Sequence, residues 1–306
     1  MKKNIVIVGG SGFIGRHLLK HYLQCGDRVE TVIPDPESVA DLKNEFENLS
    51  IVKAVFEDFD RLSANLTFKH IDLFYYLAWG GYGSATNDYR EQVKNIKPLC
   101  DAVSEAAKIG CDRFIFSTSF SEYMISENET KTHDQGAFCN VYGSTKHAAR
   151  IMAQAVAAQR KMTFISVAFA NTFGPGDRSK RSTNLFIHKL LNGEALDLTE
   201  GQHLYDWNYI DDTINGLVLA GEKGKTDSVY YIGNNERRPL KDIVCDVRDI
   251  LNPKVEIRLG TYKEDFHVDY SCVDVHKLYR ETGYLAKTDF SEAVLKTADW
   301  VKLLNW

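Results

Sequence analysis

Short apolar runs alternate with amphipathic stretches over the first half of the chain. The apolar runs that predict β-strands are Ile5–Val8, Val29–Ile33, Ile51–Phe56, Ile71–Leu77, Phe114–Ser117 and Thr163–Phe169. Helical spacing between these runs predicts helices, of which the clearest are Phe13–Gln24, Glu91–Lys108 and Val141–Arg160. Near-continuous apolar strands separated by helices are typical of a parallel sheet that is covered on both faces. The pattern therefore predicts an α/β fold with a doubly wound parallel sheet.

The pattern changes beyond Asn171, where Gly174-Pro175-Gly176 interrupts the alternation. Shorter helices are expected in this part of the chain at Asn184–Leu191, Leu240–Leu251 and Ser291–Leu304. Ser291 is suited to cap the last of them, and Val229–Ile232 predicts a further strand. The sequence shows no internal repeat and no low-complexity linker.

The change of pattern predicts a division into two domains. Residues 1–170 are expected to form the first domain, which is rejoined by part of segment 206–236. The remainder of residues 171–306 is expected to form a smaller, discontinuous α/β domain. A length of 306 residues is sufficient for two domains, although one large α/β unit has a similar length.

Composition and charge exclude several classes of protein. Hydrophobic residues make up 44% of the chain and charged residues 26%, which excludes a disordered or fibrous protein. The net charge of −5 and the lack of a long basic run argue against nucleic-acid binding. No apolar stretch approaches the roughly 18 residues that cross a bilayer, and Ile5–Val8 is too short for the core of a signal peptide. We therefore expect a cytoplasmic protein that does not contact membranes.

The six cysteines are scattered along the chain, at positions 25, 100, 111, 139, 245 and 272, without a C-x-x-C pair. Scattered thiols of this kind are usual in a reducing compartment. The distribution therefore indicates neither a disulfide framework nor a zinc site, and we expect no metal.

A glycine-rich loop joins the first expected strand to the first expected helix. Its sequence Gly9-Gly10-Ser11-Gly12-Phe13-Ile14-Gly15 satisfies G-x-x-G-x-x-G and, from Gly10, G-x-G-x-x-G. Glycines at this spacing allow a tight turn, a close approach to a pyrophosphate and close packing of helix on strand. The amino end of the helix then offers free N–H groups and a positive dipole to the anion. The loop therefore predicts a dinucleotide site made by Gly9, Gly12, Phe13, Ile14 and Gly15.

Dinucleotide sites often hold the adenosine ribose with an acidic residue about 20 residues beyond the glycine loop. Asp35 lies at a suitable distance, although Pro34 separates it from the end of the second expected strand. If Ile33 takes the ribose position instead, no acidic residue stands there to repel a 2′-phosphate. NAD and NADP are therefore both open as cofactors. Asp58, after the third expected strand, is either a partner for the adenine amine or an ordinary solvated loop acid.

Tyr142 and Lys146 stand four residues apart at the start of the expected long helix. Positions four apart share a helix face, so the ammonium can lie near the phenol. A cation there favours the phenolate and is expected to lower the pKa of Tyr142 from its usual value of about 10. Tyr142 is then a candidate general acid or base, and Lys146 can also reach a cofactor ribose.

In their order and spacing these motifs resemble the extended short-chain dehydrogenase/reductase family, also called the NAD-dependent epimerase/dehydratase family. The elements that carry the resemblance over essentially the whole chain are the glycine loop, Leu77-Ala78-Trp79, Asn95, Phe114–Ser119, Tyr142 with Lys146, Asn171 with Gly174-Pro175-Gly176, and Tyr209-Ile210-Asp211-Asp212. The resemblance implies a Rossmann domain that binds NAD(P), with Leu77 and Ala78 against the cofactor. It also implies a smaller carboxy-terminal domain that holds a nucleotide-linked sugar, and a homodimer formed through helices 91–108 and 141–160.

The resemblance assigns catalytic roles as well. Family members use a Ser or Thr just after the fifth strand to hold the reacting oxygen, and the matching position is Ser119. Thr118 is a near competitor, and Tyr123 lacks a lysine four residues later. Ser119, Tyr142 and Lys146 are therefore the expected catalytic residues.

Departures from the family pattern narrow the reaction. Sugar 4,6-dehydratases of the family place Asp and Glu directly after the Ser or Thr, whereas Phe120 and Ser121 stand here. The cysteine by which GDP-fucose synthases epimerise falls at Ser121 as well. Water elimination and epimerisation at carbons 3 and 5 are therefore not expected, and we assign Ser121 to substrate binding. A 4-ketoreductase or a 4-epimerase needs only hydride transfer and one proton.

Two arginines of the family pattern are replaced in this chain. Ala168 stands three residues before Asn171, and Tyr205 takes the place of an arginine that contacts the diphosphate in UDP-galactose 4-epimerases. The alternative phosphate partners are Arg178, Lys180, Arg181, Arg237, Arg238 and Lys263. Tyr205 and Trp207 are suited either to stack on a base or sugar or to pack within the second domain. The expected substrate-binding residues are Ser121, Asn171, Arg178, Arg181, Tyr205 and Trp207.

The function that fits these residues best is an NAD(P)-dependent nucleotide-sugar 4-ketoreductase. Tyr142 is expected to protonate the developing alkoxide, Ser119 to orient it, and Lys146 to assist Tyr142 and hold the ribose. NADPH is the favoured reductant for such a reaction. The alternatives are an NAD-dependent nucleotide-sugar 4-epimerase, which recycles its cofactor in place, and a non-catalytic dinucleotide-binding regulator.

Overall fold

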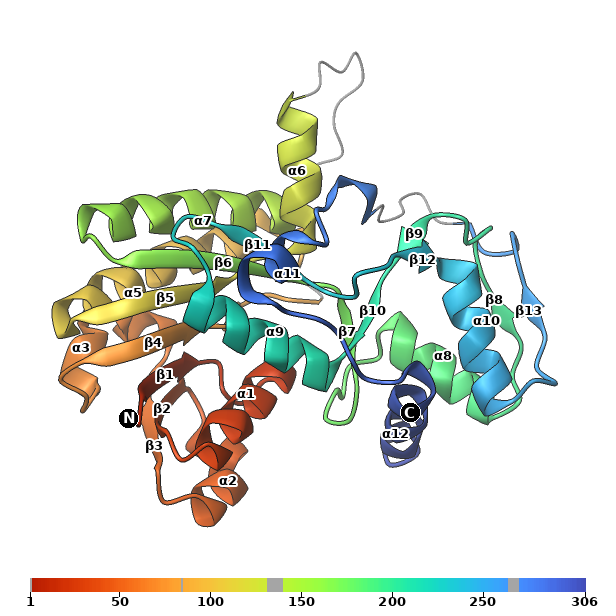
Figure 1. Cartoon of the computed structure of the whole chain (residues 1–306), viewed down its shortest axis with the longest axis horizontal. Coiled ribbons are helices and arrows are strands. Elements are labelled where there is room, and N and C mark those ends of the chain that lie inside the picture. The colour runs from red at the N-terminus through yellow and green to blue at the C-terminus, as the bar shows by residue number, and fades with distance from the viewer. Residues whose placement is uncertain (1, 84, 131–139, 264–269) are drawn as a thin grey trace.

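The computed structural model describes residues 2–83, 85–130, 140–263 and 270–306 and contains a seven-stranded sheet (Figure 1). Its strands are β1 (Asn4–Val8), β2 (Arg28–Ile33), β3 (Leu49–Lys53), β4 (Ile71–Tyr76), β5 (Cys111–Ser117), β6 (Thr163–Phe169) and β11 (Val229–Ile232). All neighbouring strands are parallel, in the order β11-β6-β5-β4-β1-β2-β3. The chain starts in the middle of the sheet and reverses direction between β1 and β4. The predicted doubly wound α/β sheet is confirmed.

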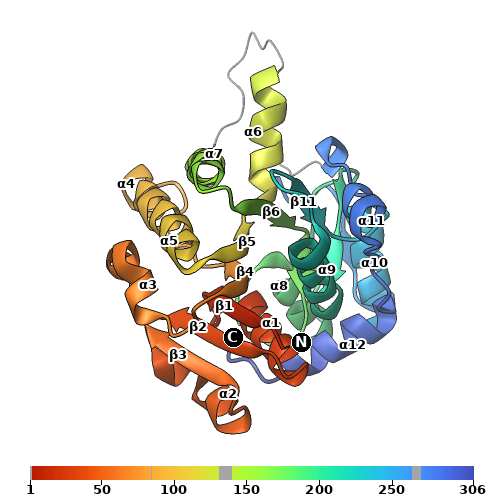
Figure 2. The same ribbon diagram turned by 60° about the vertical axis from the view of Figure 1, so that its left-hand side comes forward.

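Helices cover both faces of the sheet (Figure 2). One face carries α1 (Phe13–Gln24) and α9 (Ile210–Lys223), and the other carries α3 (Leu62–Asn65), α5 (Ile96–Ile109) and α7 (Val141–Gln159). Successive strand residues point to opposite faces, so Ile5 and Ile7 of β1 join the core under α1, whereas Val6 and Val8 join the core under α5 and α7. Strands buried on both sides therefore explain the near-continuous apolar runs in the sequence.

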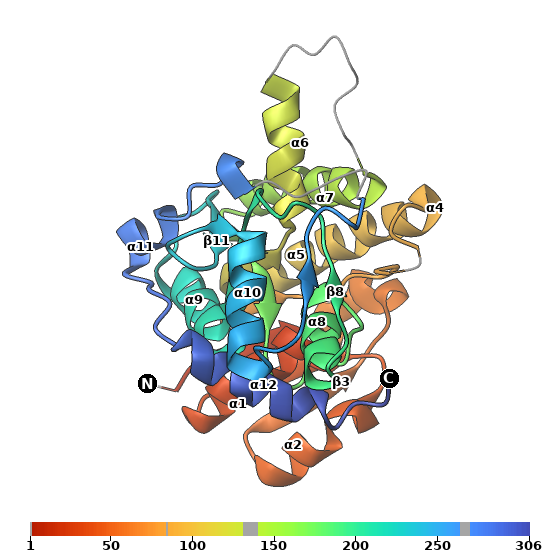
Figure 3. The same cartoon turned by 90° about the vertical axis from the view of Figure 1, so that its right-hand side faces the viewer.

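The carboxy-terminal segments form a second lobe beside the sheet (Figure 3). It contains α8 (Ser182–Leu191), α10 (Leu240–Leu251), α12 (Phe290–Val301) and three two-stranded sheets. The strand pairs are β7 (Asn171–Phe173) with β10 (Trp207–Tyr209), β8 (Leu196–Asp197) with β13 (Ile257–Arg258), and β9 (Leu204–Tyr205) with β12 (Arg238–Pro239). Its apolar core is continuous with the core under α1 and α9.

The remaining helices are short or lie at the edges of the molecule. They are α2 (Ala40–Glu45), α4 (Tyr89–Gln92), α6 (Phe120–Thr130) and α11 (Lys277–Thr282). Figure 1 shows α6 projecting away from the sheet. The strand β11 returns from the late segment to pair with β6, Val229 facing Ser166. The division into domains at residue 170 stays a prediction.

Several element boundaries differ from the sequence prediction. The strand expected at Ile51–Phe56 is β3, which starts at Leu49 and ends at Lys53. Phe56 instead opens the 3₁₀ helix η2 (Phe56–Arg61), because the Asp58 carboxylate accepts a hydrogen bond from the backbone N–H of Val55 at 3.1 Å. Strand β5 begins at Cys111, three residues earlier than expected.

The helix expected over Glu91–Lys108 is divided into α4, the 3₁₀ helix η3 (Val93–Asn95) and α5. The buried Asn95 side chain donates to the carbonyls of Gly80 at 3.1 Å and Gln92 at 3.0 Å. Pro98 has no backbone N–H to continue the α-helical ladder from the preceding turn. These two features explain the break.

The last helix begins at Phe290, and its cap is Asp289. The Asp289 carboxylate accepts a hydrogen bond from the N–H of Glu292 at 3.0 Å. The prediction of Ser291 as the cap is therefore wrong, because Ser291 already lies in the first turn. A carboxylate three residues before the bonded N–H satisfies the same requirement.

Within the described ranges no helix combines the length and apolarity that a membrane crossing requires. The thiols of Cys25, Cys100, Cys111 and Cys245 are free, and Cys139 lies outside the described residues. Burial raises the pKa of Cys111, which packs in the core under α5. A thiol with a raised pKa is a poor nucleophile at neutral pH.

Candidate active site

A cleft opens at the carboxyl ends of β1, β4 and β5, where the strand order reverses. It has a volume of about 300 Å³ and is lined by the glycine loop, Leu77 and Ser117 from the sheet, and Asp177, Ser179 and Arg181 from the second lobe. Ligands of doubly wound sheets bind at such a switch point. The structure therefore brings together predicted residues that are more than 150 positions apart in the sequence.

The glycine loop has the geometry of an anion cradle. Gly9 has φ +89°, and a Cβ there would lie 2.9 Å from the backbone nitrogen of Ala78. A Cβ at Gly15 would lie 2.1 Å from the carbonyl oxygen of Gly9. Gly12 caps α1 without a side-chain hydrogen bond, and the first turn holds no acidic residue. The free N–H groups and the dipole of α1 therefore fit a pyrophosphate at this position.

Asp35 and Asp58, the two acidic residues expected near the adenosine of the cofactor, each cap a 3₁₀ helix. The Asp35 side chain is exposed and accepts a hydrogen bond from the N–H of Glu37 at 3.2 Å, beyond the end of β2. Asp58 caps η2. Neither carboxylate lines the cleft over the glycine loop. The ribose and adenine roles given to Asp35 and Asp58 stay predictions.

Arg16 is a cation beside the glycine loop that the sequence did not single out. It projects from α1 to the carbonyl of Ser38 at 3.1 Å and forms an ion pair with Asp41. These residues line a groove of about 920 Å³ on the outer side of the glycine loop. Arg16 directly follows Gly15, but the sequence alone does not place the segment 36–41 against it.

Tyr142 and Ser119 meet next to the cleft, beside Tyr82, which lines it. Ser119 follows β5, accepts a hydrogen bond from the N–H of Ser121 at 3.2 Å, and is hydrogen-bonded to the Tyr142 phenol. Tyr142 lies in the first turn of α7, which is capped by Asn140 through the N–H of Gly143 at 2.5 Å. The end of a strand and the start of a helix thus hold two hydroxyls together.

Lys146 lies on the same side of α7 as Tyr142, as predicted. Its ammonium is 5.9 Å from the centre of the Tyr142 ring, 3.9 Å from the centre of the Trp79 ring, and donates to the carbonyl of Ser117 at 2.7 Å. Burial lowers the pKa of Lys146 to about 7, and the charge of Glu122 opposes this shift. Lys146 is therefore about half ammonium and half amine at neutral pH.

Burial raises the pKa of Tyr142 to about 12, and Tyr82 adds to the rise. The hydrogen bond from Ser119 and the charge of Arg181 oppose it. The prediction that Lys146 lowers this pKa toward neutrality is wrong, because the ammonium is directed to Ser117 and Trp79 and burial dominates. Tyr142 is a fully protonated phenol at neutral pH.

No carboxylate occupies the two positions after Ser119. Phe120 is buried and packs on Tyr270 with ring centres 4.1 Å apart, and Ser121 faces Gly143. The next residue, Glu122, is buried and pairs with Arg150. Its oxygens also accept a hydrogen bond from Thr118 and contact His147 at 3.2 Å. Thr118 is thus bound to Glu122, which favours Ser119 as the hydroxyl of the site.

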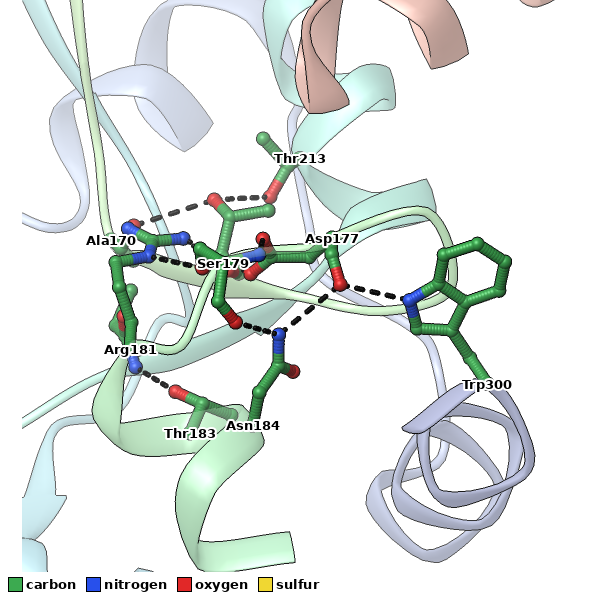
Figure 4. Close-up of polar contacts among 10 residues, drawn as sticks. Ala170, Asp177, Ser179, Arg181, Thr183, Asn184, Thr213 and Trp300 are labelled. Carbon is green, nitrogen blue, oxygen red and sulfur yellow. Dashed lines mark hydrogen bonds and ion pairs between the residues drawn. The ribbon is translucent and has the colours of Figure 1, made fainter. Parts of the chain in front are cut away.

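A polar network fixes the segment that carries Arg181 (Figure 4). The Asn184 amide donates to the carbonyls of Asp177 at 3.2 Å and Ser179 at 2.9 Å. The indole N–H of Trp300 donates to the same Asp177 carbonyl at 2.8 Å. Arg181 bonds Ser179 at 3.2 Å and the Asp177 carboxylate at 3.4 Å. Arg181 is thereby held at the edge of the cleft, facing the glycine loop.

The other expected substrate residues are more dispersed. Arg178 is exposed and lines the outer groove beside Arg16, and the Asn171 amide donates to Thr183 at 2.5 Å. Tyr205 is half-buried, with its ring centre 5.4 Å from that of Tyr270. These three residues stay predicted substrate contacts.

Trp207 is buried in the core and does not stack toward the cleft. It is 3% exposed, and its ring centre is 5.6 Å from that of Phe173. Trp207 also lines a pocket of about 350 Å³ in the second lobe, and its role as a substrate contact stays a prediction. The sequence alone gave no way to distinguish stacking on a ligand from packing in the core, and in the structure all three residues of β10 are buried.

Two aromatic residues of the site were missed as site residues. Trp79 lies edge-on to Tyr142 with ring centres 6.2 Å apart, and Tyr82 lies 5.6 Å from it. The Tyr82 hydroxyl is hydrogen-bonded to Arg181, so the two residues meet over the cleft. Trp79 was visible as the third residue of Leu77-Ala78-Trp79, whereas no sequence signal distinguished Tyr82.

The sequence profile of the NAD dependent epimerase/dehydratase family matches residues 5–233. The chain belongs to this family. The resemblance inferred from the motifs is thereby confirmed, and the chain is an NAD-dependent enzyme of the extended short-chain dehydrogenase/reductase type. Membership of the epimerase/dehydratase family favours an enzyme over a non-catalytic regulator.

Individual relatives of the epimerase/dehydratase family are distant in sequence and close in fold. The dTDP-glucose 4,6-dehydratase of Streptomyces antibioticus is 22% identical over 319 residues, covering 98% of this chain and 92% of the relative. The UDP-N-acetylglucosamine 4-epimerase of Methanobrevibacter ruminantium M1, solved with UDP-N-acetylmuramic acid, has a TM-score of 0.80 at 20% identity, covering 98% of each chain. The Bordetella bronchiseptica enzyme WbmF, solved with NADH, has a TM-score of 0.77 at 20% identity, covering 98% of this chain and 92% of WbmF.

Proposed function

We propose that this enzyme is a nucleotide-sugar 4-ketoreductase that uses NADH or NADPH. The nicotinamide cofactor supplies the hydride when bound. Tyr142 donates the proton to the sugar oxygen, Ser119 holds that oxygen through its hydroxyl, and Lys146 sets the charge beside the phenol. Hydrogen-bond donors fixed at the atom where negative charge develops give large rate effects.

The observation that carries the proposal is the protonated Tyr142 phenol, which is hydrogen-bonded to Ser119 and packs beside Tyr82 of the cleft. A reduction starts with a protonated acid, and a pKa of about 12 keeps Tyr142 in that state at neutral pH. Phe120 and Ser121 stand where a dehydratase of this family needs two carboxyl groups. One proton donor therefore supports a reaction that moves one proton, which a ketone reduction does.

The cleft also supports the ligand classes. The glycine loop and the uncapped start of α1 fit the cofactor pyrophosphate, and Arg181 faces the same volume from the second lobe. WbmF was solved with NADH, and the Methanobrevibacter enzyme was solved with a UDP-linked sugar. Arg16 and Asp41 offer opposite charges near the adenosine end, so a direct comparison of the dissociation constants of NADH and NADPH decides the cofactor.

A nucleotide-sugar 4-epimerase is the second candidate, since the same three residues serve an oxidation followed by a reduction. The name of the Methanobrevibacter relative supports it. An epimerase keeps its cofactor bound and consumes none, whereas a reductase oxidises one NAD(P)H per turnover. The absorbance spectrum of the purified protein and the consumption of added NAD(P)H distinguish the two.

The decisive experiment is turnover of Tyr142→Phe with a panel of 4-keto nucleotide sugars. Loss of general acid catalysis is expected to lower kcat by about 10²–10⁴-fold with an unchanged fold. Tyr76→Phe is the matched control, because its hydroxyl is buried without a partner among the described residues and lies in the core under α5 and α7. Full activity of Tyr142→Phe contradicts the proposal.

We further propose that the enzyme acts as a homodimer through α5 and α7. Ile151 and Met152 on α7 are 49% and 52% exposed, and Val93 beside α5 is 48% exposed. Apolar side chains exposed together on neighbouring helices are typical of a helical interface.

A further inference from the structure

The buried Lys146 ammonium has few compensating partners. Lys146 is 2% exposed, so water does not solvate the three donors of its ammonium. Within the described residues, the acceptor it reaches is the carbonyl of Ser117, at 2.7 Å. A buried cation with one hydrogen bond needs a further source of stabilisation.

That source is the face of Trp79. The ammonium lies 3.9 Å from the centre of the Trp79 ring and 4.9 Å from that of Phe116. A cation within about 6 Å of an aromatic ring centre is attracted by the electron density of the ring face, and most strongly by tryptophan. The attraction increases when the contact is desolvated, as it is here.

The orientation of Trp79 is fixed from its other edge. Its indole N–H donates to the Gln92 amide oxygen at 2.9 Å. Gln92 is fully buried at the end of α4, and its amide nitrogen donates to the carbonyls of Gly81 at 2.8 Å and Ala85 at 3.0 Å. The ring therefore holds its place independently of Lys146.

None of the charged or titratable groups described below stabilises the Lys146 ammonium by direct contact, so we assign this stabilisation to Trp79. Glu122 approaches from α6, but its carboxylate is taken up by Arg150, His147 and Thr118. Tyr142 from the same helix is a neutral phenol at neutral pH. Neither group gives Lys146 a direct counter-ion.

We infer that Trp79 is a positioning residue of the site, whose indole face holds Lys146 as an ammonium one helical turn from the Tyr142 phenol. The inference deepens the proposed function, since the catalytic use of Lys146 rests on that proposal. The contact between indole and ammonium does not depend on which sugar is converted.

The test is the protonation midpoint of Lys146, measured without substrate. Lysine labelled with ¹³C at Cε gives one signal per side chain, and the Lys146 signal is assigned by its loss in Lys146→Arg. In the wild-type protein its midpoint is expected near pH 7. In Trp79→Leu the aromatic face is removed, and the midpoint is expected to fall by about one pH unit, which is a tenfold fall in the ratio of ammonium to amine at a given pH.

Two further variants separate the aromatic face from simple packing. Trp79→Phe keeps a ring face and loses the bond to Gln92, so its midpoint is expected to lie between those of the wild type and Trp79→Leu. Trp306→Leu removes an indole at the end of the chain, which stacks on His188, and is expected to leave the midpoint unchanged. Equal midpoints in Trp79→Leu and wild type overturn the inference.

A second measurement applies if Trp79→Leu does not fold. Growth on fluorinated tryptophan withdraws electron density from the indole ring with little change in its volume, and Trp79 is the tryptophan whose ring the described structure places over Lys146. The midpoint is expected to fall with each added fluorine, and an unchanged midpoint overturns the inference. Because the signal is read without substrate, an inactive enzyme with the expected midpoints contradicts the proposed function alone.

Discussion

The pKa values of Tyr142 and Lys146 move in opposite directions, to about 12 and about 7, for a single physical reason. Burial disfavours the charged form of each side chain, which is the phenolate of the tyrosine and the ammonium of the lysine. The site is therefore close to neutral in this state. When negative charge develops on a bound substrate, Tyr142 and Lys146 can therefore donate a proton to it without first breaking a strong ion pair.

The pKa of Lys146 predicts a slope in stability with pH. Its pKa is about 7 in the folded chain and 10.5 in the unfolded chain, so the unfolded state binds more protons between these values. The free energy of unfolding is therefore expected to rise by about 1.4 kcal/mol per pH unit from pH 7 toward 10, from this residue. Lys146→Met is expected to lack this rise, as measured by denaturant titrations at several pH values.

The slope, and not the absolute stability, is the quantity to compare. Lys146→Met leaves the Ser117 carbonyl without its partner, which costs about 1–3 kcal/mol at every pH. Lys97→Met is a suitable control, because the Lys97 side chain is 74% exposed and its removal leaves the slope from Lys146 in place. An identical slope in the wild type and Lys146→Met contradicts the assigned pKa.

Motif spacing could predict which residues form the site but could not predict their charge states. Tyr142 and Lys146 follow from their spacing, since a helix places residues four apart on one face, whereas Ser119 was implied by the family resemblance. The raised pKa of Tyr142 could not be predicted, because it depends on burial by Trp79 and Tyr82 from a distant loop. The core position of Trp207 depends on tertiary packing in the same way.

At the scale of elements, the contact between α6 and α7 determines where Ser119 lies. Gly143 directly follows Tyr142, and a Cβ there would lie 2.7 Å from the Cβ of Ser121 and 3.0 Å from Ile125. The first of these atoms is attached to the backbone of α6 and cannot rotate away. Close approach of the two helices therefore requires glycine at this position.

Gly143→Ala is expected to lower both stability and turnover. At a solvent-exposed position inside a helix, Gly→Ala stabilises the protein by about 0.5–1 kcal/mol. A net loss of stability therefore identifies the steric contact with α6 as the larger effect. Ser119 directly precedes α6 and accepts a hydrogen bond from the N–H of Ser121. Displacement of α6 therefore moves Ser119 away from Tyr142 and is expected to reduce kcat at least about tenfold. Thermal unfolding and kcat, measured on one preparation, check both expectations.

Ala148→Gly is the matched control for Gly143→Ala, because Ala148 lies on the exposed side of the same helix. It is expected to lower stability by about 0.5–1 kcal/mol through helix propensity and to leave kcat unchanged. A gain of stability in Gly143→Ala with full activity contradicts the proposed steric constraint.

Whether a segment forms a helix or a strand could be predicted over most of the sheet and the helices that cover it, whereas the first and last residues of these elements were predicted less well. The ranges of α1, β6, β11 and α10 agree with the apolar pattern, because buried positions repeat with the period of each element. The break before α5 escaped the prediction because the Asn95 side chain competes for backbone groups of a loop that is distant in sequence. Side-chain bonds of this kind leave no trace in hydrophobic periodicity.

At the scale of the whole molecule, the site is a consequence of topology. Parallel strands place their carboxyl ends at one edge, so the loops after β1, β4 and β5 converge without any direct signal in the sequence. That part of the site could be predicted from the strand pattern. Arg181 was expected to bind substrate, but its place over the glycine loop and the contribution of Asp177 could not be predicted, because the network with Asn184 and Trp300 forms only in the folded second lobe.

The residues on the outer side of α7 predict that two copies of the chain form a homodimer through this helix. Ala149, Ala153 and Ala157 are spaced four apart and face the sheet, which leaves Ile151 and Met152 on the opposite side at 49% and 52% exposure. Stable interfaces bury about 800 Å² on each partner, and exposed apolar residues at their centre carry much of the binding energy.

The double variant Ile151→Glu with Met152→Glu is expected to be a folded monomer. Two carboxylates placed opposite their own copies repel each other and lose the apolar contact, while the helix face toward the sheet is untouched. Light scattering after size-exclusion chromatography is expected to give twice 34.7 kDa for the wild type and 34.7 kDa for the variant. Leu295→Glu, at a 51% exposed position on α12, is expected to remain dimeric. A monomeric wild type, or a dimeric double variant, contradicts assembly through α7, whereas dissociation by Leu295→Glu instead places the interface on the second lobe.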